Sequence, residues 1–121
     1  MCRGGGVNLE PDEARLRFAG AAVARLATLG PNGRPHIVPI TFAVDGDQIY
    51  TAVDEVKPKT TAHLRRLRNI AADPRVSLLA DHYEGDWERL WWVRADGTAT
   101  LLGEPGQMTG PLSLLARRYP Q

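Results

Sequence analysis

Lys57 and Lys59, the only lysines of the chain, lie two positions apart just before a predicted helix, in a sequence whose other basic residues are arginines. Ammonium groups beside the free backbone N–H groups of a helix start bind anions, above all phosphate. Thr60 and Thr61 add hydroxyl donors at the same point. The pattern indicates an anion site. A solvated basic helix face is the alternative, because no glycine-rich loop accompanies the lysines.

Three arginines extend the basic field along the helix that follows. A narrow stripe of apolar residues predicts a helix over residues 59–71, with one face packed on strands. Arg65, Arg66 and Arg68 lie largely off this stripe. The stripe consists of Ala62, Leu64, Leu67, Ile70 and Ala71.

Other catalytic side chains lack a recognisable pattern. The histidines His36, His63 and His82 show no metal-ligand spacing, so the sequence predicts no metal site. Ser77 falls inside a predicted strand and Ser113 inside a predicted helix, and neither has a base pattern nearby. An anion site without acid–base or metal machinery is typical of a protein that takes its chemistry from a cofactor.

Trp87, Trp91 and Trp92 fall within six residues, too many for one face of a small barrel. Strand alternation places Trp91 and Trp92 on opposite faces. One of them is expected in the core. The other is expected to meet a partner subunit or to stack on a planar ligand.

Composition excludes several classes of protein. A length of 121 residues fits a single domain, and a net charge of +1 argues against a nucleic-acid-binding protein, which usually carries a strong basic excess. No run approaches the roughly 18 apolar residues of a membrane span. No apolar segment of a secretory signal follows the N-terminus, and the single cysteine, Cys2, cannot form an internal disulfide. These features predict a cytoplasmic protein without a membrane span.

The residue pattern predicts short hairpins around one crossover helix. This order favours a mainly β (α+β) fold, namely a closed or split antiparallel β-barrel with terminal helices. Residues 10–121 are expected to form this barrel as a single domain. Pro39 cannot donate to a ladder, so its strand needs an edge, a bulge or a backbone left open for a ligand. The Asp96-Gly97 pair favours a hairpin, with one long strand as the alternative. The predicted elements are a flexible leader (1–9), a helix from Glu10, strands at 22–29, 36–44 and 49–53, the helix 59–71, a strand at 75–83, the strand or hairpin 88–103 and a helix from Met108.

Four stretches resemble the FMN-binding split β-barrel family, whose fold is that of pyridoxamine 5′-phosphate oxidase. They are "ATLGPNGRPHIVPI", "IYTAVDEVKPKT", "LRNIAADPRVSLL" and "WWVRADGTATL". The resemblance covers residues 20–103, and the order and spacing of the pieces are more specific than any one of them. Within the family, the chain looks most like the actinobacterial group that binds the deazaflavin coenzyme F420.

The resemblance implies a homodimer with two identical cofactor sites in grooves between the subunits. Carried over by position, one strand backbone passes along the cofactor ring, and a second strand lines the same groove. The lysine pair matches the residues that hold the cofactor phosphate, and an aromatic residue with an arginine comes from the neighbouring subunit. The implied cofactor-binding residues are Val38, Pro39, Ile40, Thr41, Tyr50, Thr51, Ala52, Lys57, Lys59, Thr60, Trp91 (or Trp92) and Arg94.

The choice between flavin and deazaflavin depends on the part of the cofactor beyond the phosphate. Both carry a tricyclic ring and a ribityl phosphate, so both need the same groove and cation pair. The deazaflavin adds a phospholactyl-glutamate tail with further carboxylates, which Arg65, Arg66 and Arg68 suit. The abundance of arginine, alanine and glycine also fits the GC-rich organisms that make it. Coenzyme F420 is therefore favoured, with FMN as the alternative.

The activity that the resemblance implies is hydride transfer between C5 of the deazaflavin and a conjugated small-molecule substrate. No catalytic side chain is assigned, because Tyr50, His36 or a water remain equal candidates for the proton donor. An FMN-dependent oxidase or reductase of the same fold and a non-catalytic cofactor-binding protein are the alternatives. Family members usually carry a further segment after the C-terminal helix, and without it part of the groove wall is lacking.

Overall fold

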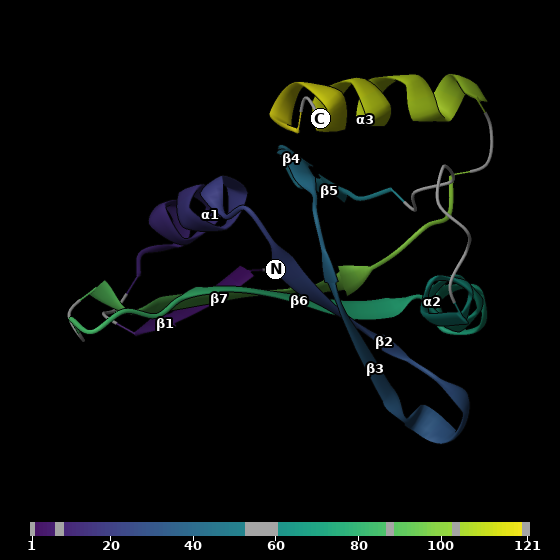
Figure 1. Ribbon diagram of the computed structural model, residues 1–121, viewed down its shortest axis with the longest axis horizontal. Helices are drawn as coiled ribbons and strands as arrows, with labels where there is room; N and C mark the ends of the chain where they lie inside the picture. The colour runs from purple at the N-terminus through teal and green to yellow at the C-terminus, as the bar shows by residue number, and fades with distance from the viewer. Residues whose placement is uncertain (1, 7–8, 53–60, 87–88, 103–104, 120–121) are drawn as a thin grey trace.

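The computed structural model describes residues 2–6, 9–52, 61–86, 89–102 and 105–119. Helices separate runs of consecutive strands along the described chain, as expected for an α+β protein (Figure 1). Their order is β1 (Cys2–Gly6), α1 (Pro11–Gly20), β2 (Ala24–Leu29), a short 3-10 turn (Pro31–Gly33), β3 (Pro35–Ile40), β4 (Ala43–Asp45), β5 (Gln48–Tyr50), α2 (Thr61–Ala72), β6 (Arg75–His82), β7 (Trp91–Thr98) and α3 (Pro105–Arg118).

The strands form two antiparallel sheets. Five strands pair in the order β1-β7-β6-β2-β3, and β4 pairs with β5 separately. The larger sheet does not close on itself within the described residues, because β1 and β3 stand at its two ends. This arrangement confirms the α+β class and the split antiparallel barrel. β3 is an edge strand of this sheet within the described residues, which is one of the three settings expected for Pro39, and Pro39 lies on it opposite Arg25.

The N-terminal residues differ from the predicted flexible leader over 1–9. Cys2–Gly6 form β1, which pairs with β7 in a register from Cys2 opposite Ala95 to Gly6 opposite Trp91. A glycine-rich segment shows no alternation and has low strand propensity, so the sequence pattern contains no sign of a strand. The pairing uses backbone hydrogen bonds, which need no side chains.

The favoured hairpin about Asp96-Gly97 is wrong, and the alternative of one long strand is correct. Asp96 and Gly97 continue β7 opposite Ser77 and Val76 of β6. The Ser77 hydroxyl donates to Asp96 Oδ1 at 2.8 Å, so the aspartate has a cross-strand partner instead of a place in a turn. By contrast, Asn32 and Gly33 do form a turn, between β2 and β3, with φ angles of 61° and 74°.

The predicted strand 36–44 is broken after Ile40. β3 ends there in the large sheet, and β4 begins at Ala43 in the small one. Thr41 and Phe42 between them carry the chain from one sheet to the other, where β4 and β5 rise toward α3 (Figure 1). Unbroken alternation through residues 36–44 gave no signal of this break.

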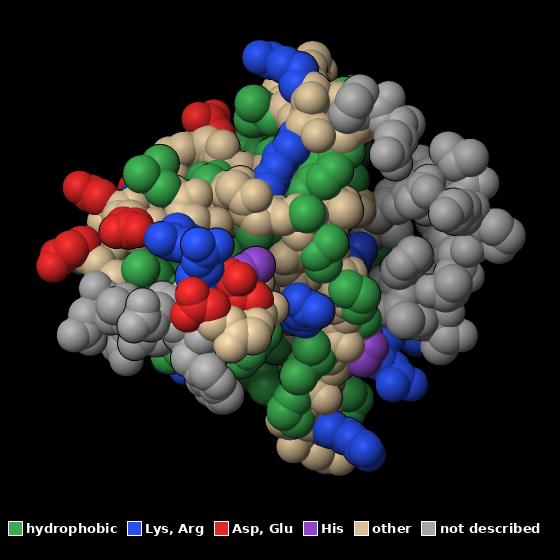
Figure 2. Space-filling model, turned by 60° about the vertical axis from the view of Figure 1, so that its left-hand side comes forward, with side chains coloured by type: hydrophobic (Ala, Val, Ile, Leu, Met, Phe, Trp, Pro, Cys, Tyr) green, Lys and Arg blue, Asp and Glu red, His purple; other side chains and the backbone are tan. Residues whose placement is uncertain are grey.

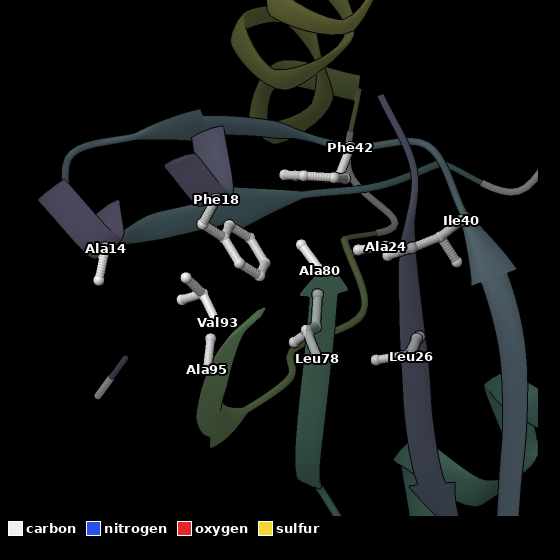
Figure 3. Close-up of a cluster of buried hydrophobic side chains, with 10 residues drawn as sticks. All are labelled: Ala14, Phe18, Ala24, Leu26, Ile40, Phe42, Leu78, Ala80, Val93 and Ala95. Atoms are coloured by element: carbon white, nitrogen blue, oxygen red, sulfur yellow. The ribbon is translucent and has the colours of Figure 1, made fainter. Parts of the chain in front are cut away.

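One face of the large sheet carries the core, and we call it the inner face. Its side chains are Leu26, Leu78 and Val93, with neighbours on the same strands, and α1 covers them (Figure 3). Phe18 of α1 meets Phe42 with ring centroids 5.0 Å apart and planes tilted by 53°. The full cluster is Ala14, Phe18, Ala24, Leu26, Ile40, Phe42, Leu78, Ala80, Val93 and Ala95.

The three helices are short. α1 begins with Pro11 and has Asp12 and Glu13 in its first turn, where the positive end of the helix dipole favours carboxylates. The helices contain 10, 12 and 14 residues. Accordingly, no helix in the described ranges is long and apolar enough to cross a membrane.

The packing of Phe18 predicts a large loss of stability on truncation. Phe18 is 2% exposed, so Phe18→Ala leaves a cavity and should lower the free energy of unfolding by about 3–5 kcal/mol. Urea denaturation followed by tryptophan fluorescence measures this change. The matched control Tyr83→Ala removes an aromatic ring that is 70% exposed and should change stability by less than about 0.5 kcal/mol. Equal losses in both variants would contradict the core assignment.

Candidate functional site

The predicted ring-binding strand lies at the open edge of the large sheet. Val38 packs against the core, and Ile40 is buried in it, so neither side chain is available to a ligand. Pro39 and Thr41 are exposed. Among the described residues β3 has a partner strand on only one side, and its other side leaves backbone groups open to a ligand.

The second predicted strand lies beside the end of the first. The Thr51 hydroxyl donates to the Thr41 carbonyl oxygen at 2.7 Å and joins the two segments. Tyr50 ends β5 opposite Ala43 and is half-buried, whereas Thr51 and Ala52 are exposed. Thr41, Thr51 and Ala52 therefore come together, as the sequence predicted for one groove.

Helix α3 forms one wall of a hollow at this place. The hollow has a volume of ≈ 300 Å³. Among its described lining residues, Thr41 and Tyr119 have polar side chains. The sequence predicts a helix from Met108, but none of its residues was expected in the site. An amphipathic stripe predicts burial without indicating which surface it faces. The lining residues are Thr41, Ala52, Leu112, Leu115, Ala116 and Tyr119.

The end of α3 is fastened to the backbone near the hollow. Arg118 donates to the carbonyl oxygen of Phe42 at 2.7 Å and also to that of Ala21. Its guanidinium carbon lies 4.7 Å from the centre of the Phe42 ring. The Tyr119 hydroxyl donates to the Ala22 carbonyl oxygen at 2.9 Å and lies 3.4 Å from the Phe42 amide nitrogen. These contacts fix the helix relative to β3 and β4.

The two described tryptophans lie on opposite faces, as predicted. Trp91 packs against the core cluster and stacks with His82 at a centroid distance of 6.4 Å. Trp92 and Arg94 share the outer face of β7, and Arg94 pairs with Asp96 at 3.2 Å. Alternation along β7 thus separates Trp91 from Arg94, and Trp92 is the tryptophan that accompanies this arginine.

The predicted phosphate site lies outside the described residues. Lys57, Lys59 and Thr60 all belong to the segment 53–60, and Trp87 also lies outside the described part. The described part of the helix that follows is α2 (Thr61–Ala72), and the predicted boundary at 59 lies outside the described residues. The phosphate site therefore stays a prediction.

The three arginines of α2 do not share one environment. Arg65 and Arg68 are exposed, but Arg66 is 5% exposed, contrary to its predicted place off the apolar stripe. Burial lowers the pKa of the Arg66 guanidinium. Arg66 packs on the same side of the helix as Asn69, whose amide donates to the Thr28 hydroxyl at 3.0 Å. The long methylene stem of arginine can occupy an apolar position, which a binary pattern does not anticipate.

The described side chains offer little chemistry of their own. No group of three His, Cys, Asp or Glu residues comes together as a metal site within the described ranges. His36 has a buried Nδ1 atom without a hydrogen-bond partner there. An open strand edge opposite an apolar helix wall fits the face of a planar ring, and the size of the hollow is at the lower end for ligand pockets. Fold and site together define a split barrel with a surface groove suited to a planar ligand.

The comparisons with known proteins agree with this class. The family model described as pyridoxamine 5′-phosphate oxidase matches residues 11–120, and the chain belongs to that family. It is similar to a 5a,11a-dehydrotetracycline/5a,11a-dehydrooxytetracycline reductase of Streptomyces rimosus, with 33% identity over 88 residues. The match covers 72% of this chain and 60% of the reductase, so the chain spans less than two thirds of that relative.

Two solved structures share the fold. A conserved hypothetical protein from Mycobacterium tuberculosis superposes with a TM-score of 0.76 at 25% identity, over 94% of this chain and 66% of the other. An FAD-binding protein from Mesorhizobium loti gives 0.68 at 24% identity, over 97% of this chain and 78% of the other. The resemblance inferred from the sequence is therefore confirmed at the level of family and fold.

The acid–base behaviour of Asp73 gives a testable prediction near α2. Arg75 donates to its carboxylate through Nη2 at 2.7 Å, through Nε at 3.0 Å and through its backbone amide at 3.1 Å. These hydrogen bonds lower the pKa of Asp73 from 3.8 to about 2. A carboxylate with a lowered folded-state pKa stabilises the protein above its unfolded-state pKa, and this contribution is lost as the pH falls through the folded value.

Arg75→Gln should therefore raise the pKa of Asp73 toward 3.8, as followed by carboxyl carbon NMR during an acid titration. Arg34→Gln removes an equally exposed charge outside the pair and should leave the Asp73 pKa near its wild-type value. An ordinary pKa in the wild-type protein would contradict the pairing.

Proposed function

We propose that this chain is an oxidoreductase that binds coenzyme F420 and exchanges a hydride with a conjugated small-molecule substrate. The observation that carries the proposal is the hollow where Thr41 and Ala52 meet the apolar face of α3. It unites an open strand edge, a second strand predicted for the same groove and an apolar wall. Membership of the pyridoxamine 5′-phosphate oxidase family supports a flavin-type cofactor, and the similarity to a reductase supports redox chemistry.

One group of residues would bind the ring of the cofactor, and a second group would bind its phosphate. The unpaired backbone groups of β3 would hydrogen-bond the polar edge of the ring, while Leu112 and Leu115 exclude water from its face. The Thr51–Thr41 hydrogen bond keeps the groove in shape, because it joins the two segments that form it. Lys57, Lys59 and Thr60 would hold the phosphate at the start of α2.

The mechanism assigns binding and orientation to the protein. The reduced cofactor, when bound, supplies a hydride from C5 of its ring. This chain supplies a water-poor surface that stacks the acceptor at contact distance, which lowers the entropic part of the barrier. The Tyr119 hydroxyl is engaged with Ala22, and Thr41 is the other polar residue of the lining. Such a lining favours a neutral, planar acceptor.

The outer face of the large sheet supports the proposed homodimer. Among the described residues, α1 and α2 contact the inner side through Phe18 and through the hydrogen bond from Asn69 to Thr28, whereas Arg118 of α3 contacts Phe42 between β3 and β4. On the outer face, Ile37 is 64% exposed and Leu79 is 36% exposed. Figure 2 shows hydrophobic side chains open to solvent among charged ones on one side of the molecule.

Charge on the outer face favours a second copy of this chain as the occupant. The face carries Arg25 with Asp81 at 3.5 Å, and Arg94 with Asp96 at 3.2 Å. A face with both signs interspersed around apolar residues is self-complementary, as an isologous twofold interface requires. Trp92 lies on the same face and would meet the neighbouring subunit.

The cofactor assignment predicts the effect of removing both lysines. Lys57→Ala with Lys59→Ala should weaken F420 binding by more than about tenfold without unfolding the domain, because two charge-assisted contacts to the phosphate are lost. Fluorescence titration with F420 and with FMN measures this loss and also distinguishes the two cofactors. The control pair Arg34→Ala with Arg89→Ala removes two exposed charges elsewhere and should keep wild-type affinity. Unchanged affinity in the lysine variant would refute the phosphate site, and preference for FMN would assign the flavin branch.

The dimer assignment predicts dissociation when charge enters the outer face. Ile37→Asp with Leu79→Asp should convert a dimer into a folded monomer, because carboxylates cannot be buried there without a partner. Sedimentation equilibrium measures the mass, and circular dichroism reports the fold. Leu16→Asp alters a side chain that is 74% exposed on α1 and should leave the dimer intact. A wild-type monomer would sink the proposed interface.

A further inference from the structure

A second hollow lies between α2 and the turn that joins β2 to β3. Its volume is ≈ 600 Å³, twice that of the hollow beside α3. Both the helix and the turn contribute apolar and charged side chains to it. The lining residues are Leu29, Gly30, Pro31, Arg65, Arg68, Asn69, Ala72 and Asp73.

The charge balance of this hollow is positive. Arg65 and Arg68 lie three positions apart on α2, which places them side by side on one helix face. Neither guanidinium has an ion pair with an acidic side chain in the described part of the chain, where the ion pairs involve other residues. Two arginines on the wall of one hollow offer forked donors that match carboxylate geometry.

Asp73, the acidic residue of the described lining, is already paired with an arginine outside the hollow. Asp73 accepts three hydrogen bonds from Arg75, and these lower its pKa to about 2. Its charge therefore stays paired with Arg75 at neutral pH, and Asp73 does not compensate Arg65 and Arg68. An incoming anion would meet two available cations.

The floor of the hollow is held in a fixed shape. Asn69 is 5% exposed and donates to the hydroxyl of Thr28, which ties α2 to β2. The Gly30 amide donates to the Arg34 carbonyl oxygen at 2.8 Å, which closes the turn on the other side. A Cβ atom on Gly30 would stand 3.2 Å from that oxygen and 3.6 Å from Asn69 Oδ1. A side chain at position 30 would therefore crowd the carbonyl oxygen of the turn itself, whereas its distance from the helix residue Asn69 is an ordinary contact.

We propose that this hollow is a second ligand site, which binds a carboxylate-bearing aliphatic group through Arg65 and Arg68. Leu29, Pro31 and Ala72 suit the methylene groups between carboxylates, and the two guanidinium groups suit the carboxylates themselves. One source of such a group is the glutamate tail of the deazaflavin, and that assignment rests on the proposed function. The other source is a free carboxylate ligand, which does not depend on it.

The direct test uses the dipeptide γ-glutamyl-glutamate as the probe and amide NMR of the full chain. Addition of the dipeptide should shift the resonances of Gly30 and Ala72, because both residues line the hollow. Arg65→Gln with Arg68→Gln should abolish these shifts, whereas Arg17→Gln with Arg89→Gln, which alters two exposed arginines outside the hollow, should retain them. The triamide of the dipeptide, in which all three carboxylates are replaced by neutral amides, should give none. Absence of shifts in the wild-type protein, or unchanged shifts in the Arg65/Arg68 variant, would overturn the proposal.

Cofactor titration then identifies the source. If the tail occupies the hollow, the Arg65/Arg68 variant should lose about tenfold in F420 affinity but less than about twofold in FMN affinity, because FMN has no carboxylate tail. Retained F420 affinity together with lost dipeptide binding would support the free carboxylate as the ligand. If the wild-type protein binds neither cofactor, the proposed function fails, while the dipeptide experiment still decides the carboxylate site.

Discussion

The arrangement of the groove depends on the hydrogen bonds that the Arg118 guanidinium donates to two backbone carbonyl oxygens. The guanidinium bonds the carbonyl oxygens of Ala21 and Phe42 and lies over the Phe42 ring, so one side chain joins the end of α3 to two distant junctions of the chain. Both carbonyls belong to connections between elements and therefore lack ladder partners. A charged donor satisfies them at little conformational cost, because the adjacent Tyr119 is held by Ala22 and Phe42. These contacts fix the position of α3, which forms the apolar wall of the groove.

The sequence predicts those strands in which the alternation of apolar and polar residues matches one buried and one exposed face. Alternation identified β2, β3 and β6 and separated Trp91 from Trp92, because each of these strands has one buried face. The pattern could not predict β1, whose glycines pair through backbone alone, nor the break after Ile40, where alternation continues through a change of sheet. A dipeptide signal such as Asp96-Gly97 is local. The pairing of β7 with β6 overrode it through cross-strand contacts along the whole strand.

The candidate site was only partly predictable for a related reason. Thr41, Thr51 and Ala52 were identified because they lie in predicted strands that carry the family resemblance. Leu112 and Leu115 were missed, since a helix stripe specifies burial but no partner. Arg66 shows the opposite case, in which a charged residue occupies an inward position that a hydrophobic pattern assigns to apolar side chains. Charge alone therefore did not distinguish the exposed arginines of α2 from the buried one.

The two hollows differ in a way that bears on cofactor choice. The hollow beside α3 has an apolar wall and a few hydroxyl groups, and such a surface recognises the shape of a tricyclic ring. Flavin and deazaflavin rings have similar shapes, so this groove alone cannot separate them strongly. The hollow beside α2 carries two guanidinium groups without acidic partners in the described residues. Cofactors that differ by carboxylates are distinguished by such charges. A guanidinium forms charge-assisted hydrogen bonds only with the cofactor that carries the carboxylate, whereas apolar contacts with the ring stabilise both cofactors. On the proposed function, α3 would orient the reacting ring, and α2 would decide which cofactor carries it.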